Sequence, residues 1–135
     1  MISYGNRGMH AFLIVGREIT NNKEQITNLA LKNSAKIIPF TLQKMEDVKE
    51  LKKLLKFSFN EKTAIVIEDI DNTTPEAANA FLKNLEEPNN NLIYILTASN
   101  FENVLPTIVS RCQVIRIKNE ELIINNKNIN YKDEL

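Results

Sequence analysis

The sequence predicts a single α/β domain, in which a five-stranded and mostly parallel sheet carries helices on both faces. Two observations support this fold class. Five apolar runs of strand length recur along the chain, and segments with helical periodicity lie between them. In addition, 135 residues are enough for one hydrophobic core, and 43% hydrophobic with 25% charged residues is typical of a globular domain.

The five predicted strands are apolar along most of their length, as expected for a parallel sheet that is covered on both faces. Gly16 closes the first of them. Because strands and helices alternate, the connections are predicted to be right-handed crossovers. The predicted strands are Ala11–Val15, Ala35–Phe40, Thr63–Ile67, Leu92–Leu96 and Val114–Ile117.

Four helices are predicted between these strands, and the third has the clearest limits. Thr73 is expected to cap it, and Glu76, three residues later, to complete a capping box. Pro75 suits its first turn and Pro88 ends it. The lysines of the second helix lie off its apolar stripe, so we interpret them as a solvated face, with phosphate contact as the alternative. The predicted ranges are Glu24–Leu31, Glu46–Phe57, 73–88 and Leu105–Val109.

Charge and cysteine content exclude several kinds of site. Seventeen basic and seventeen acidic residues cancel, so no overall field attracts nucleic acid, and contact with DNA is expected to be indirect. Cys112 is the only cysteine and His10 the only histidine, which excludes an internal disulfide and a multi-cysteine zinc site; no metal site is expected. No apolar run is long enough to span a membrane, which favours a cytoplasmic protein. The C-terminal Lys-Asp-Glu-Leu is interpreted as chance.

The segment after Gly16 occupies the place of a phosphate-binding loop, which needs the pattern G-x-x-x-x-G-K-[ST]. In this register Asn21 replaces the second glycine, Asn22 the lysine and Lys23 the hydroxyl residue. The loop is therefore expected to be degenerate, with no nucleotide or other cofactor bound by this chain. At the end of the third predicted strand, Glu68 and Asp69 are candidates for a magnesium- and water-binding acidic pair, while solvation and capping of a helix start is the alternative.

Four segments together resemble the ATPase-like first domain of the bacterial DNA polymerase III clamp-loader subunits gamma/tau and delta-prime, which belong to the AAA+ superfamily. The resemblance covers residues 10–118 and implies a P-loop NTPase-like fold for a domain at 1–118. The remaining residues, 119–135, are expected to be a weakly ordered tail, too short for the lid and collar domains of such subunits. The four segments are HAFLIVG (10–16), NAFLKNLEEP (79–88), LTASN (96–100) and LPTIVSRCQ (105–113).

The resemblance also implies roles for individual residues. Arg111 matches an arginine finger that touches the ATP of a neighbouring subunit, with a structural ion pair as the alternative. Ser110 and Cys112 complete its motif and are expected to shape the loop, and without a basic partner the thiol of Cys112 is not expected to be reactive. Thr97 and Ser99 match the position of a sensor residue, or else hydrogen-bond the strand end. The segment 79–88 ends in the other motif of the resemblance, which consists of Leu85, Glu86, Glu87 and Pro88.

These observations favour a non-hydrolysing, delta-prime-like clamp-loader subunit that acts in DNA replication, with ATP and magnesium held by a neighbour. Its expected partners are the gamma/tau and delta subunits, and the sliding clamp is a further candidate. Two alternatives remain at this stage. One is an active gamma/tau-type ATPase that uses Glu68 and Asp69, and the other is a stand-alone protein-binding scaffold.

Overall fold

A computed structural model gives the fold over residues 10–57, 59–87 and 91–117. The predicted tail at 119–135 and Pro88 lie outside the described residues. Strands and helices alternate along the chain as predicted, with two short 3-10 helices (η) in addition. The elements are β1 (Ala11–Val15), α2 (Ile19–Lys32), β2 (Lys36–Pro39), α3 (Met45–Leu54), β3 (Thr63–Ile67), η1 (Ile70–Asn72), α4 (Pro75–Glu86), β4 (Leu92–Ala98), η2 (Phe101–Asn103), α5 (Pro106–Val109) and β5 (Gln113–Arg116).

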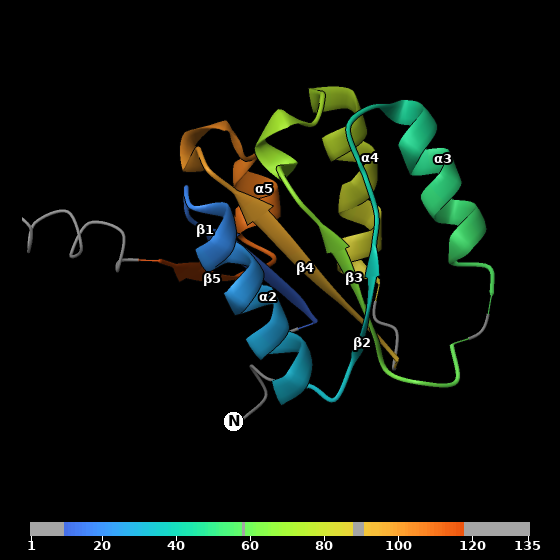
Figure 1. Ribbon diagram of the computed structural model, residues 1–135. Coiled ribbons are helices and arrows are strands. Elements are labelled where there is room, and N and C mark those ends of the chain that lie inside the picture. Colours follow the sequence, from blue (N-terminus) through green and yellow to red (C-terminus); the bar gives the residue numbers. More distant parts are fainter. Residues whose placement is uncertain (1–9, 58, 88–90, 118–135) are drawn as a thin grey trace, which may run out of the picture.

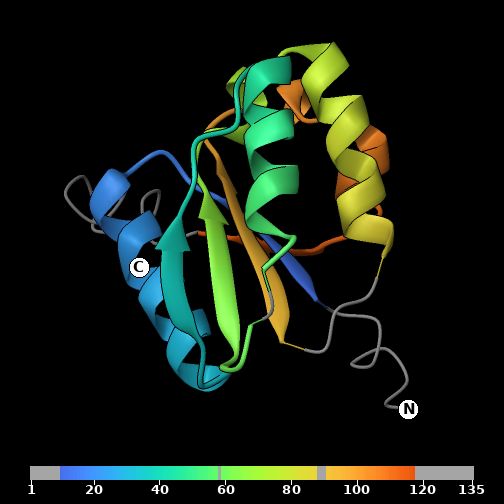
Figure 2. The same cartoon turned by 90° about the vertical axis from the view of Figure 1, so that its right-hand side faces the viewer.

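The five strands form one sheet in the order β2-β3-β4-β1-β5, and every neighbouring pair is parallel. The predicted α/β class is therefore confirmed, and the sheet is entirely rather than mostly parallel. The central strands β3 and β4 are buried at every position, which explains why they lack the polar alternation of a half-exposed strand. In Figure 1, α2 lies in front of the sheet, and Figure 2 shows α3, α4 and α5 on the opposite face.

Each face of the sheet has its own apolar core, because successive side chains of a strand point to opposite faces. Phe12 and Ile14 of β1 pack with Ile26 of α2 on one face. On the other face, Phe81 of α4 is fully buried and meets the ring of Tyr94 edge-on, with ring centroids 5.5 Å apart. Helices thus cover both faces of the sheet. Because all strands are parallel, their amino ends lie at one edge of the sheet and their carboxyl ends at the other.

Helix α2 begins five residues before its predicted start at Glu24. Its first turn buries no apolar side chain, because Ile19 is 67% exposed and the next three residues are polar, so the apolar periodicity does not mark it. Backbone hydrogen bonds nevertheless hold this turn in helical form, as the Asn22 N–H donates to the Glu18 carbonyl at 3.0 Å. Helix α3, by contrast, ends at Leu54 rather than at Phe57.

The predicted capping box of α4 is wrong by one residue. Thr74 is the N-cap, and its hydroxyl accepts a hydrogen bond from the Ala77 N–H at 3.2 Å. The hydroxyl of Thr73 instead donates to the Leu42 carbonyl at 2.6 Å, which ties the helix start to the loop before α3. Both threonines satisfy the sequence rule for a cap, and the contact with Leu42 decides between them.

Candidate functional site

The carboxyl edge of the sheet brings together the residues that were predicted from the nucleotide-binding pattern. Strands β1, β4 and β3 are neighbours, so the loops that follow them lie side by side. The Gly16 N–H donates to the Ala98 carbonyl at 3.0 Å, and the Asp69 N–H donates to the Thr97 hydroxyl at 3.1 Å. In open parallel sheets this edge is where ligands bind.

The connection between β1 and α2 consists of residues 16–18, because α2 already begins at Ile19. Asn21 therefore lies inside the helix, without the left-handed backbone that a glycine of a phosphate loop supplies. Asn22 is 7% exposed, and its side-chain Nδ2 donates to the Gly16 carbonyl at 3.0 Å. Its backbone N–H is used within the helix. A phosphate loop needs such N–H groups turned toward the anion, and here the first turn of α2 uses this one internally.

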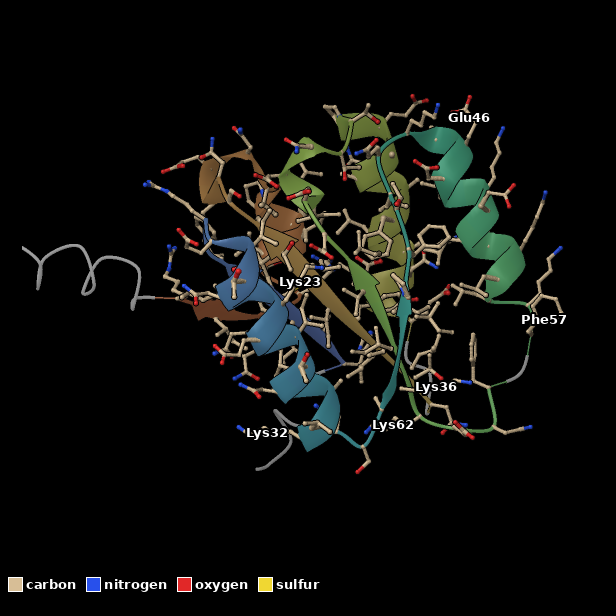
Figure 3. The ribbon with its side chains drawn as sticks, viewed as in Figure 1. Lys23, Lys32, Lys36, Glu46, Phe57 and Lys62 are labelled. Atoms are coloured by element: carbon tan, nitrogen blue, oxygen red, sulfur yellow. The ribbon has the colours of Figure 1, made fainter. Side chains whose placement is uncertain are left out.

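Lys23 faces the acidic residue that follows β3. Its Nζ lies 3.8 Å from Oε2 of Glu68, and the two side chains are 62% and 41% exposed; Figure 3 shows Lys23 on α2. Such an exposed pair contributes about 0–1 kcal/mol to folding. The carboxylate that matches a metal- or water-binding group thus has a cation of its own chain as a partner. Over the residues that the structure describes, no group of three or more His, Cys, Asp or Glu side chains could hold a metal ion.

The acidic segment after β3 also joins two loops. Asp69 has a left-handed backbone, with φ 60° and ψ 47°, and stands at the start of η1. Asp is among the residues that tolerate this conformation. Two residues later, Oδ2 of Asp71 accepts a hydrogen bond from the Asn100 N–H at 2.9 Å. Sequence reasoning missed Asp71, since its partner comes from another strand end and no local spacing signals the contact.

Thr97 and Ser99 differ in their surroundings. Thr97 is buried, and its hydroxyl accepts the hydrogen bond from Asp69 described above, so it links the ends of β3 and β4. Ser99 is exposed immediately after β4. The hydrogen-bonding role considered for the strand end therefore applies to Thr97, and a sensor role for either residue stays a prediction.

The two motifs singled out by the resemblance meet at the other edge of the sheet. Nη2 of Arg111 lies 2.6 Å from Oε2 of Glu86, the last residue of α4. Nη1 of the same guanidinium donates to the Thr107 carbonyl at 3.0 Å and to the Ser110 hydroxyl at 3.2 Å. The side chains of Arg111 and Glu86 are 36% and 47% exposed. The ion pair that was weighed as the alternative for Arg111 is therefore present, and the finger role stays a prediction.

The other described residues of the two motifs differ in burial and in their contacts. Leu85 is 2% exposed and belongs to the core between α4 and the sheet. Glu87 is exposed at the C-terminal end of α4. Cys112 is 8% exposed, and burial raises the pKa of its thiol to about 12, so the thiol is neutral at physiological pH. The Ser110 hydroxyl donates to the Thr107 carbonyl at 3.0 Å while it accepts from Arg111, and it thereby orients the guanidinium.

The topology separates Arg111 from the loop after Gly16. Glu86 ends the helix that leads into β4, and Arg111 directly precedes the first residues of β5. All strands are parallel, so Arg111 and Glu86 lie near the amino ends of the strands, whereas Gly16 and Glu68 follow their carboxyl ends. A strand of five residues such as β1 spans about 16 Å. Arg111 is thus separated from the loop after Gly16 by about the length of a strand.

A five-stranded parallel sheet in this strand order, with helices on both faces, defines the chain as an open α/β domain. The chain belongs to the family described as DNA polymerase III, delta subunit, whose sequence model matches residues 33–121. The resemblance to the first domain of the clamp-loader subunits is thereby confirmed.

Several relatives agree with this assignment. The chain is 40% identical over 65 residues to the DNA polymerase III subunit delta' of Haemophilus influenzae, covering 47% of this chain and 20% of that protein. It is 41% identical over 54 residues to subunit delta' of Bacillus subtilis, covering 40% and 16%. It is 30% identical over 97 residues to subunit gamma of Buchnera aphidicola, covering 68% and 26%. The chain thus spans about a quarter or less of these relatives.

A solved structure shows the same fold. It is the crystal structure of a DNA polymerase III gamma subunit-related protein from Thermotoga maritima, with a TM-score of 0.66 and 22% sequence identity. The match covers 89% of this chain and 45% of that one. Within the described residues, no helix has both the length and the apolar character that crossing a membrane requires.

Proposed function

We propose that this chain acts in the cytoplasm as a delta-prime-like subunit of a DNA polymerase III clamp loader, without hydrolysing ATP itself. In this role Arg111 contacts the ATP of a neighbouring gamma/tau-type subunit, and primer-template DNA is reached only through partners. The main support is the arrangement of the two edges of the sheet. The first turn of α2 and the side chain of Asn22 fill the loop after Gly16, while Arg111 lies at the opposite edge.

The loop after Gly16 is a poor phosphate site for reasons of charge as well as shape. No lysine stands at the position where a phosphate loop has one, and Asn22 is bonded to the Gly16 carbonyl instead. Lys23, the nearest lysine in sequence, faces Glu68. A triphosphate would therefore need both a rearranged helix start and a broken ion pair, which favours a chain that does not bind ATP.

Arg111 has the chemistry that the proposed role needs. A guanidinium stays charged at all physiological pH values and presents a planar set of donors that matches phosphate oxygens. Set against the terminal phosphate of a neighbour's ATP, it stabilises the charge that develops during phosphoryl transfer. The neighbour would hold the ATP and magnesium, and this chain would supply the cation.

Reconstitution tests this function. The full chain is combined with the ATP-hydrolysing gamma-type subunit, the delta subunit and the sliding clamp of the same organism, and ATP hydrolysis is measured with primed DNA. We expect the wild-type chain to stimulate hydrolysis and Arg111→Ala to lose most of the stimulation, because arginine fingers are worth about 10³–10⁵ in rate. Arg116→Ala is the matched control, because it also removes one arginine but outside the motif. The guanidinium of Arg116 stacks on the Phe101 ring, 4.3 Å from its centroid. Equal stimulation by wild type and Arg111→Ala would refute the finger.

An ATP-hydrolysing gamma-type function is the second candidate, because the match to the Buchnera gamma subunit extends over 68% of this chain. Titration of the isolated chain with a fluorescent ATP analogue and Mg²⁺ separates the two. The proposal expects no saturable binding at micromolar concentrations. Saturable binding that Glu68→Gln weakens would favour the hydrolase. If the wild-type chain neither binds ATP nor stimulates its partners, the stand-alone scaffold is favoured.

A further inference from the structure

The guanidinium of Arg111 is folded back onto its own chain. Nη1 donates to the carbonyl of Thr107 and to the hydroxyl of Ser110, and Nη2 forms the ion pair with the carboxylate of Glu86. A guanidinium that binds a phosphate uses two neighbouring donors, so the contacts at Nη1 and Nη2 compete with a phosphate for Arg111.

The three acceptors are not equivalent. Thr107 and Ser110 belong to α5 and the turn after it, the same short segment as Arg111, so they move with it. Glu86 comes from the end of α4 and is the acceptor that carries a charge. A carboxylate and a phosphate that share one guanidinium repel each other, and the repulsion grows when an interface excludes water. Glu86 is therefore the contact that an incoming phosphate must replace.

We propose that Glu86 is a positioning residue that holds Arg111 in the folded-back state until an ATP-bound neighbour docks, when the guanidinium passes from the carboxylate to the neighbour's terminal phosphate. This inference rests on the proposed function. The contact with Glu86 lowers the fraction of the chain that has a free guanidinium, and the apparent affinity for the ATP-bound neighbour falls by that fraction. Docking to a nucleotide-free neighbour does not use Arg111 and is unaffected.

The exposure of the pair sets the size of this effect. The two side chains are 36% and 47% exposed, so water screens their attraction and competes for their donors and acceptors. Coupling in exposed ion pairs corresponds to about a 1.4- to five-fold change in an equilibrium constant. Glu86 is thus strong enough to bias the position of Arg111 and weak enough to be displaced by a triphosphate.

The chain offers a matched control in the neighbouring carboxylate. Glu86→Gln and Glu87→Gln each remove one negative charge from the same end of α4, and both have the same sign of effect on the helix dipole. Glu86 contacts the guanidinium, and Glu87 lies one residue further on at the exposed C-cap. A difference between the two variants therefore reports the contact with Arg111 and not the change in net charge.

The test measures binding of the labelled full chain to the gamma-type subunit by fluorescence anisotropy, with a non-hydrolysable ATP analogue and without nucleotide. We expect Glu86→Gln to bind the analogue-loaded subunit about 1.4- to five-fold more tightly than wild type. Its affinity for the nucleotide-free subunit should not change. Glu87→Gln should match wild type in both states, and Glu86→Ala should repeat the result of Glu86→Gln.

The outcomes separate the two proposals. If Glu86→Gln binds the analogue-loaded subunit no more tightly than wild type, while Arg111→Ala loses the gain in affinity that the analogue produces, the holding role of Glu86 is refuted and the finger survives. If Arg111→Ala keeps the whole of that gain, the finger itself is refuted and the role of Glu86 with it. Thermal melting of each isolated variant checks that a changed affinity does not come from loss of the fold.

Discussion

The ion pair between Glu86 and Arg111 is expected to contribute little to folding, although its atoms are close. At 2.6 Å between Oε2 and Nη2, the attraction of two unit charges is roughly 1.6 kcal/mol at the dielectric constant of water. Ordering two long side chains costs a comparable amount, up to about 2 kcal/mol for an arginine. With side chains 36% and 47% exposed, the net coupling should be about 0.2–1 kcal/mol.

A double-mutant cycle measures this coupling. Wild type, Glu86→Ala, Arg111→Ala and the double variant are unfolded in urea and followed by circular dichroism. Because urea m-values of small proteins are about 1–3 kcal/mol/M, a coupling of 1 kcal/mol corresponds to about 0.3–1 M in the midpoint. A second cycle with Glu87→Ala in place of Glu86→Ala should give no coupling. A coupling above about 2 kcal/mol would show that the pair is desolvated. Glu86 would then hold Arg111 too strongly for a neighbour's phosphate to displace it, which would contradict the proposal.

Three further predictions concern the core and its titration. Phe81→Ala should lower the free energy of unfolding by about 3–5 kcal/mol, because Phe81 is fully buried. Phe57 is 70% exposed and lies beyond the end of α3 (Figure 3), so Phe57→Ala should change that free energy by less than about 0.5 kcal/mol. The urea midpoints of the two variants measure the difference. Burial raises the pKa of Tyr94 from 10.0 to about 12. As the pH rises, the tyrosine hydroxyl therefore ionises in the unfolded chain first, and the free energy of unfolding falls between these pH values by up to about 1.4 kcal/mol per pH unit. This fall should be smaller in Tyr94→Phe. Cys112 should react with a thiol reagent at pH 8 far more slowly in the folded chain than in urea, and equal rates would contradict its burial.

The order of the elements could be predicted because both strand and helix signals are local. A strand buried on both faces is an apolar run, and the predicted limits of β1 and β3 agree with the structure. The start of α2 could not be predicted from periodicity, since a first turn held by backbone hydrogen bonds needs no apolar side chains. At α4, two adjacent threonines both fit a cap, and the contact of Thr73 with Leu42 settles the choice.

The sequence by itself determined the α/β class and the absence of a lysine at the position of Asn22, because composition and spacing are visible along the chain. The tertiary structure alone decided which distant side chains meet. It pairs Lys23 with Glu68 and Arg111 with Glu86, and it sets these pairs at opposite edges of the sheet. The physical reason is that such contacts depend on which strands become neighbours and on which edge each loop emerges. Hydrogen bonding between strands and packing of the helices on both faces settle that, and neither is written in any single stretch of residues.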